Sequence, residues 1–100
     1  MDKCPAQETL EFIGQKWTLS ILRVIHKNKV RRFNELYKEL KGISPRTLSK
    51  RLEELEKEDI ISKKIYHEIP LRVEYSLTKK GTELIACFEH IDKWVSNWKK

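Results

Sequence analysis

The stretch ISPRTLSKRLEELEKEDII, residues 43–61, decides the fold. Ser44 is a good helix N-cap because its side-chain oxygen can accept a backbone N–H of the first turn, and Pro45 suits the first helical position. Three leucines at helical spacing predict one buried stripe: Leu48, Leu52 and Leu55. The N-terminal part of this helix (its front) is basic and the C-terminal part (its rear) is acidic. This asymmetry suggests that the front faces an anion.

The neighbouring segments place this helix in a helix-turn-helix followed by a hairpin. A shorter helix comes before it, for which Asn34 is a predicted N-cap, and Gly42 ends that helix in a tight KGIS turn. Behind the long helix, Val73, Tyr75 and Leu77 alternate as in a half-buried strand. The segment before this strand carries isoleucines of one parity, so the two can pair through a turn at Pro70: Ile61, Ile65 and Ile69.

Helices are also predicted at both ends of the chain. The first begins at Pro5, a second runs from about Lys16 to Asn28, and Thr78 caps the last. The predicted fold class is mainly α with a small β-hairpin, a winged helix-turn-helix. One domain over residues 1–100 is expected, with the helix-turn-helix at about 34–58, the wing at about 61–78 and the last helix at about 79–98.

Charge is distributed in blocks. The net charge is +6, but residues 23–50 carry nine Lys and Arg against two Glu, residues 51–59 carry two against five acidic residues, and residues 60–82 carry five against two. Two basic zones flank an acidic one, which favours a polyanionic partner. No stretch is long and apolar enough for a membrane span and no signal-peptide core follows Met1, so a cytoplasmic protein without membrane contact is expected.

The exposed front of the helix at residues 44–58 is the predicted DNA-reading surface. With the leucines turned inward, Arg46, Thr47 and Lys50 face outward, and Arg51 lies towards one flank. Arg and Lys can bind guanine edges or phosphates, and Thr a phosphate or a thymine methyl. The helix start adds free N–H groups and its positive dipole end, whereas the acidic rear lies beyond the reach of DNA.

Other basic residues are candidate backbone contacts. Arg31, Arg32 and Asn34 come just before or at the start of the shorter helix and are predicted to hold phosphates. An edge strand protected by charge is the alternative for this segment. In the hairpin, the candidates for a minor groove or its flanking backbone are Lys63, Lys64 and Arg72.

Four consecutive segments carry a resemblance to a known family: GQKWTLSILRVI, RRFNELYKEL, ISPRTLSKRLEELEKEDII and IPLRVEYSLTKKG. With these segments the chain resembles the HxlR-type winged helix-turn-helix regulators, relatives of the MarR group, from Cys4 to Trp98. The resemblance implies a homodimeric transcription regulator that dimerises through its first and last helices. It implies DNA-contact roles for Ser44, Arg46, Thr47, Lys50 and Arg72.

Large apolar residues near the two ends of the chain favour a dimer independently. They are hard to bury within so small a domain and are typical of interfaces. The predicted interface residues are Leu10, Ile13, Phe88, Ile91, Trp94, Val95 and Trp98. A two-fold dimer would present two recognition helices to a pseudo-palindromic operator.

The two cysteines receive different interpretations. Cys4 precedes Pro5 at the start of a helix, where the dipole favours the thiolate. Because some members of the family respond to oxidants, Cys4 is a candidate redox sensor. Cys87 shares an apolar face with Leu84 and Ile91 and is expected to be buried and inert.

Sequence motifs of common enzyme classes are absent. Phosphate-binding, metalloprotease and serine-hydrolase signatures are missing, so the chain is predicted to be no enzyme and to need no cofactor or metal. Two alternatives to a sequence-specific regulator stay open: a winged-helix module that binds protein, and a nonspecific DNA-binding protein. The sequence does not indicate a small-molecule effector.

Overall fold

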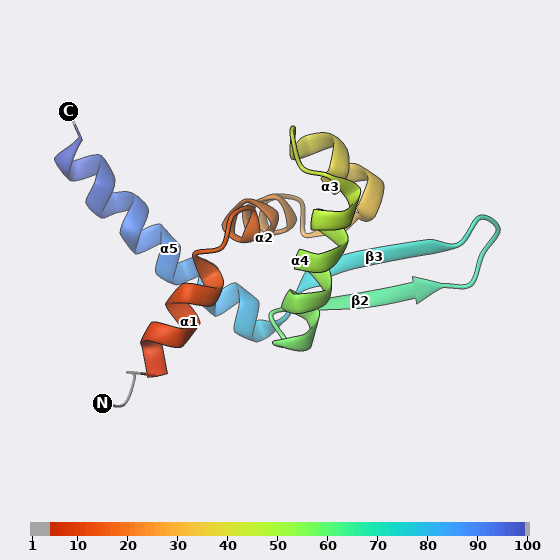
Figure 1. Cartoon of the computed structure of the whole chain (residues 1–100), viewed down its shortest axis with the longest axis horizontal. Helices are drawn as coiled ribbons and strands as arrows, with labels where there is room; N and C mark the ends of the chain where they lie inside the picture. Colours follow the sequence, from red (N-terminus) through yellow and green to blue (C-terminus); the bar gives the residue numbers. More distant parts are fainter. Residues whose placement is uncertain (1–4, 100) are drawn as a thin grey trace.

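The computed structural model describes residues 5–99, which form five helices and three strands (Figure 1). The elements are α1 Pro5–Ile13, α2 Thr18–Asn28, β1 Val30–Arg32, α3 Phe33–Glu39, α4 Pro45–Lys57, β2 Ile61–Tyr66, β3 Arg72–Leu77 and α5 Lys79–Trp98. The predicted class, mainly helical with a hairpin, is confirmed. β1 adds a third strand, and the antiparallel sheet has the order β1-β3-β2.

α4 begins where the sequence predicts. The Ser44 hydroxyl accepts the backbone N–H of Thr47 at 3.0 Å, and Pro45 occupies the first turn. The turn before it passes through Gly42 in a left-handed conformation with φ of +98°, which a glycine adopts without a steric penalty. The Trp17 ring lies against this turn, 3.7 Å from where a Cβ of Gly42 would stand. The backbone conformation of Gly42 and the packing of Trp17 therefore both support the turn between α3 and α4.

The core lies between α2, α3, α4 and the base of the sheet. α2 contributes Ile21, Leu22 and Ile25, and α3 contributes Leu36, all without measurable exposure. The three predicted leucines of α4 are buried as well: Leu48, Leu52 and Leu55. Burial of this stripe forces the opposite side of α4 to face solvent, which is what positions the candidate site.

The hairpin of β2 and β3, with its connecting residues 67–71, is called the wing below. Ile61 pairs with Leu77 and Ile65 with Val73, so the predicted parity is confirmed for these two isoleucines, whereas Ile69 lies beyond the last pair, Tyr66 with Arg72. Only the base of the wing meets the core: Ile61 is buried, whereas Ile65 is exposed. The wing projects from the helical body on the side opposite to the end of α5 (Figure 1).

α5 is anchored at its start and free at its end. The Thr78 hydroxyl accepts the N–H of Gly81 at 3.1 Å, which confirms the predicted cap, and the N–H of Thr78 donates to the Ile60 carbonyl at 3.1 Å. Further along, Arg23 of α2 donates to Asp92 at 2.8 Å. This bond raises the pKa of the Arg23 guanidinium, partly offset by burial. The C-terminal end of α5 runs away from the body (Figure 1).

Two local predictions are wrong. Asn34 does not cap α3, because the helix begins at Phe33, where the Glu35 carboxylate accepts the N–H of Arg32 at 2.8 Å. Cys87 is exposed rather than buried, because Ile85 and Phe88, three residues apart, turn one side of α5 towards the core and Cys87 lies on another side. α2 begins at Thr18, just after Trp17, whose positive φ of 82° separates it from α1.

Candidate nucleic-acid interface

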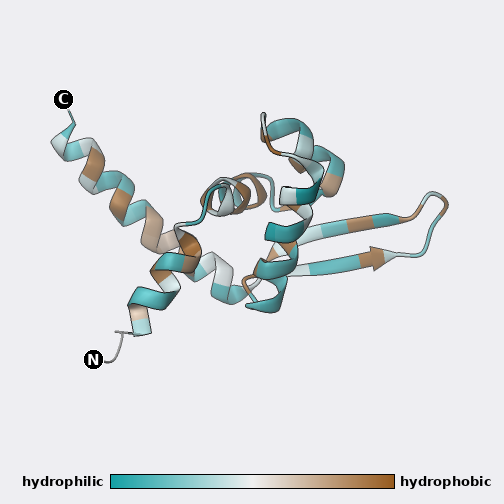
Figure 2. Cartoon of the chain, viewed as in Figure 1, coloured by the Kyte–Doolittle hydropathy of each residue, from teal (hydrophilic) through white to brown (hydrophobic). Residues whose placement is uncertain are grey.

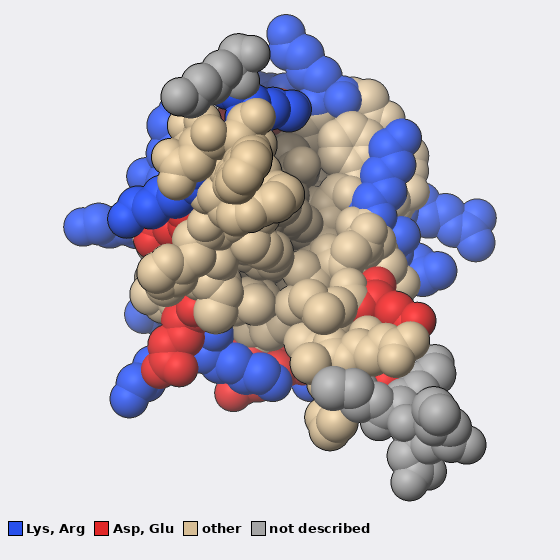
Figure 3. All heavy atoms as spheres, turned by 90° about the vertical axis from the view of Figure 1, so that its left-hand side faces the viewer, with Lys and Arg blue, Asp and Glu red and all other residues tan. Residues whose placement is uncertain are grey.

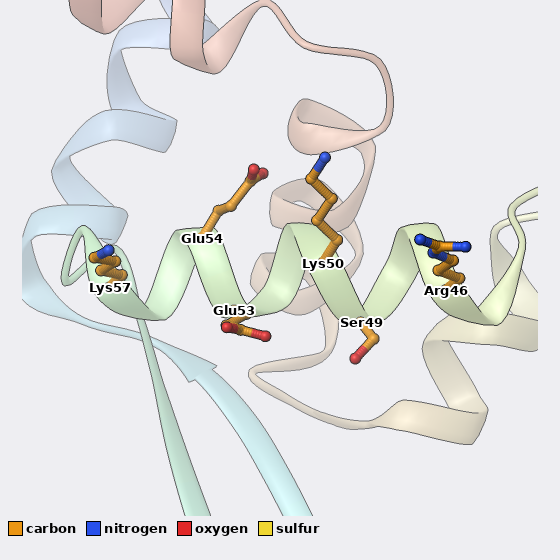
Figure 4. A pocket seen from close by; sticks show the side chains of 6 residues that line it. All are labelled: Arg46, Ser49, Lys50, Glu53, Glu54 and Lys57. Atoms are coloured by element: carbon orange, nitrogen blue, oxygen red, sulfur yellow. The ribbon is translucent and has the colours of Figure 1, made fainter.

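The outward face of α4 is a shallow hollow lined by polar side chains (Figure 4). Arg46 and Lys57 stand at its two ends, with Ser49 and Glu53 along one side and Lys50 and Glu54 along the other. The lining residues recur at helical spacing opposite the buried leucines, so the hollow follows from the amphipathic pattern of α4. Its front is basic and its rear mixed.

The front of α4 also carries a small hydroxyl network. Ser44 Oγ donates to Thr47 Oγ1 at 2.9 Å while accepting the N–H of Thr47. Thr47 Oγ1 is the acceptor in the first of these bonds, so its own hydroxyl hydrogen is left for an external acceptor such as a phosphate. Together with exposed Arg46 and Lys50, the first two turns offer donors to an anion.

Sequence reasoning missed one residue of this face. Ser49 is exposed and lines the hollow between Arg46 and Lys50. Its position three residues after Arg46 was the available signal, because residues three apart share a helix face. Glu53 and Glu54 line the same hollow directly behind Lys50, so the basic part of this face is confined to the first two turns.

Arg51, the fourth predicted reading residue on α4, is used inside the protein. Its Nε donates to the Lys16 carbonyl at 3.1 Å, and its guanidinium pairs with Glu54 at 3.2 Å. The side chain is mostly buried in this position. We therefore reassign Arg51 from a DNA contact to a tie between α4 and the segment before α2.

Of the three predicted phosphate contacts near the start of α3, one is engaged within the protein and two are exposed. Arg31 pairs with Glu39 at 2.6 Å and Glu35 at 3.4 Å, which joins β1 to α3 and offsets its charge. Arg32 and Asn34 are exposed. These two keep their predicted role as candidates, whereas Arg31 is reassigned to a structural ion pair.

The wing separates its basic residues in the same way. Lys63 and Lys64 are exposed, and being adjacent in β2 they point to opposite faces of the hairpin. Arg72 lies over the Tyr66 ring at 4.0 Å and pairs with Glu68 at 3.3 Å and with Glu74 at 3.5 Å. Arg72 is therefore held within the wing, and Lys64 also lies over the Tyr66 ring, at 4.9 Å.

At the base of the wing, Tyr75 links the sheet to α4. Burial raises the pKa of the Tyr75 hydroxyl, and the nearby charge of Glu56 raises it further. The raised pKa extends to higher pH the range over which the phenol is neutral.

The predicted interface residues form an exposed apolar surface on α5 and α1. Trp94 and Trp98 are 63% and 76% exposed, and Leu10 and Ile91 are more than half exposed. Ile13 is the exception, since it is buried within its own chain at 6% exposure. Viewed from this end, uncharged side chains fill the middle of the face and Lys and Arg lie around its edge (Figure 3).

A hollow continues this surface between α1, α2 and α5. Its apolar lining comes from Leu10, Ile13, Trp17, Leu19 and Phe88. Cys4, the candidate redox sensor, lies outside the described residues, so its role stays a prediction. Within residues 5–99, no helix could cross a membrane and no cluster of three His, Cys, Asp or Glu could hold a metal ion.

Comparison with known proteins gives one consistent result. The sequence profile of a family described as HxlR-like helix-turn-helix matches residues 12–100. An uncharacterised HTH-type transcriptional regulator of Synechocystis is 40% identical over 95 residues, which cover 95% of this chain and 70% of that protein.

Solved structures agree with this result in their folds. The reduced form of the transcriptional regulator YodB from Bacillus subtilis has a TM-score of 0.86 at 31% identity, covering 99% of this chain and 97% of that one. A putative transcriptional regulator of the MarR family from Porphyromonas gingivalis has a TM-score of 0.84 at 34% identity, covering 100% and 96%. The chain thus shares its winged helix-turn-helix fold with regulators over nearly its whole length.

Proposed function

The chain belongs to the HxlR-like helix-turn-helix family, and we propose that it is a transcription regulator that binds a specific DNA sequence as a homodimer. The observation that carries the proposal is the front of α4. There the exposed Arg46 and Lys50 and the half-buried Thr47 stand on a helix fixed from behind by buried leucines. A rigid helix with its reading residues in the first two turns suits entry into a major groove.

The residues of α4 take different parts in this mechanism. Arg46 and Lys50 have the length and charge to reach guanine O6 and N7, and Ser49 lies between them. Thr47, half-buried beside Ser44, is placed for a phosphate rather than a base. Glu53, exposed behind Lys50, would repel the backbone and so limit how far α4 can enter, whereas Glu54 is paired with Arg51.

Further backbone contacts would come from outside α4. Arg32 and Asn34 at the start of α3, with Lys63 and Lys64 in the wing, are exposed and belong to two different elements. Contacts of this kind position a protein on DNA without reading sequence and give binding its dependence on salt. The wing lysines point to opposite faces, so they suit the two sides of one groove.

The dimer is proposed to form through α5 and α1. An apolar surface that includes two exposed tryptophans on a chain of 100 residues favours a covered state. The hollow between α1, α2 and α5 offers a place for the partner's α5. Two-fold symmetry would then give two copies of α4 and a pseudo-palindromic operator.

The test compares alanine variants within α4. Arg46→Ala and Lys50→Ala remove the basic front, and Lys57→Ala removes an exposed lysine at the rear of the same hollow as the matched control. Affinity is measured on duplexes that the wild-type protein selects from a random-sequence pool, and on scrambled versions of them.

We expect Arg46→Ala to cost about 1–3 kcal/mol on the selected duplex and less on the scrambled one. Lys57→Ala should leave the difference between the two duplexes unchanged. Equal losses on both duplexes would make Arg46 a phosphate contact. A wild-type protein that selects no duplex would contradict DNA recognition itself and favour a protein partner.

A further inference from the structure

The end of the wing is apolar. Ile69 is 102% exposed and Leu71 61%, and Ile65 next to them on the hairpin is 44% exposed. Figure 2 shows hydrophobic residues at this end, at the point furthest from the helical body. Single exposed apolar residues are ordinary, but three at one projecting end form a patch that a partner can cover.

The charges around the patch limit what that partner can be. Arg72 is neutralised within the wing by Glu68 and Glu74 and stacks on Tyr66, so it does not serve the tip as a free cation. Lys63 and Lys64, by contrast, are exposed further back along β2. The wing thus has apolar residues at its tip and exposed lysines in β2. Such a surface is complementary to a polyanion whose interior is apolar.

The tip of the wing also lies near two residues predicted to contact the DNA backbone. Leu71 and Val73 line a cleft together with Arg32 and Asn34 at the start of α3. A DNA strand held by Arg32 would therefore run beside Leu71. The ion pair of Arg72 with Glu68 spans the turn, and Arg72 also lies over Tyr66 of β2, so contacts across the hairpin support its apolar end.

We propose that Ile69 and Leu71 form a wedge that enters the minor groove of DNA beside the α4 site and selects base steps that deform easily. The inference rests on the proposed DNA-binding function and adds a specificity element to it. Apolar side chains in a minor groove partly unstack the bases, and the cost of unstacking depends on the sequence. The wedge would therefore read DNA without hydrogen bonds, and the lysines behind it would hold the two backbones.

The test is the double variant Ile69→Ser, Leu71→Ser. Both side chains are largely exposed, so folding should be preserved, which circular dichroism and thermal unfolding check. Val30→Ser, an exposed aliphatic residue at the start of β1, is the matched control. Affinity and its salt dependence are measured on duplexes selected by the wild-type protein and on scrambled duplexes, and energy transfer between dyes at the duplex ends reports bending.

We expect the double variant to bind the selected duplex about tenfold more weakly, a loss of about 1.4 kcal/mol. Binding to scrambled duplexes and the salt slope should not change, because an apolar contact releases no counterions. The selected duplex should also bend less. Val30→Ser should match the wild type in every measurement.

Three results would overturn the wedge while leaving the proposed function intact. One is unchanged affinity for a selected duplex that the wild type still prefers. The second is equal loss on selected and scrambled DNA, which assigns the patch to the DNA backbone. The third is a weaker dimer by sedimentation, which assigns the patch to a second protein. A wild-type protein without any preference would remove the proposed function, and the wedge with it.

Discussion

Gly81 is the residue at which one added methyl group should do the most damage. It is buried in the first turn of α5, and a Cβ built there would stand 2.2 Å from the backbone carbonyl oxygen of Ile60. That carbonyl already accepts the N–H of Thr78 at 3.1 Å and its hydroxyl at 3.0 Å. To reach even 3.0 Å, α5 and the segment before β2 must separate by about 0.8 Å.

The magnitude follows from two opposing effects. Overpacking against a backbone that cannot rotate away costs about 2–3 kcal/mol, and alanine returns about 1 kcal/mol through its better helix propensity. Gly81→Ala should therefore lower the free energy of unfolding by about 1–2 kcal/mol. For a chain of 100 residues this lowers Tm by about 5–15 °C.

The assay is urea and thermal unfolding followed by circular dichroism. Protein concentration is held fixed, because the stability of a dimer depends on it. Lys79→Ala, on the exposed side of the same turn, is the control and should change stability by less than about 0.5 kcal/mol. A Gly81→Ala protein as stable as the wild type would refute the close approach of α5 to Ile60.

Three further predictions concern the dimer, a reassigned arginine and alkaline pH. Trp94→Ala with Trp98→Ala should convert the dimer to monomer in sedimentation, since each removes about 150–250 Å² of aromatic surface; an unchanged dimer would exclude α5. Arg51→Ala should cost about 1–2 kcal/mol in urea unfolding, through two lost contacts, and reduce DNA affinity less than Arg46→Ala; the reverse order would restore Arg51 as a DNA contact. The pKa of Tyr75 is higher in the folded than in the unfolded protein. The neutral phenol therefore contributes to the free energy of unfolding below a pH of about 10, and this contribution is lost as the pH rises through the pKa of the folded protein. Wild-type stability should therefore fall more than that of Tyr75→Phe between pH of about 9 and about 11, and equal falls would place the phenol in solvent.

The parts of the fold that depend on local chemistry could be predicted from the sequence. Ser44 and Thr78 cap their helices as expected, and the leucine stripe fixes the outward face of α4. Both caps and stripe are encoded within a few residues, so neighbouring elements hardly alter them. Asn34 shows the limit of such rules, because the carboxylate of Glu35 moved the start of α3.

The roles of individual basic residues could not be predicted in this way. Arg31, Arg51 and Arg72 have the same charge as Arg46, but each is paired with a carboxylate within residues 5–99. Three of the pairings join residues three or four apart: Arg31 with Glu35, Arg51 with Glu54, and Arg72 with Glu68. Helical or strand spacing alone does not say whether such a pair forms or whether the arginine reaches outward. The apolar end of the wing could not be predicted from the sequence either. The alternating pattern assigned Ile69 to the same face of the strand as Ile61, but strand pairing ends at Tyr66, before Ile69.

We propose that α4 and the wing together read a specific DNA sequence. Fluorescence anisotropy of the wild-type protein on a selected duplex and on its scrambled version, over a range of salt concentrations, tests it most directly. We predict an affinity at least about 10³-fold higher for the selected duplex, with a log–log salt slope of about −4 or steeper, since each neutralised phosphate contributes about 0.9. Equal affinity for the two duplexes, or binding that does not respond to salt, would contradict the account.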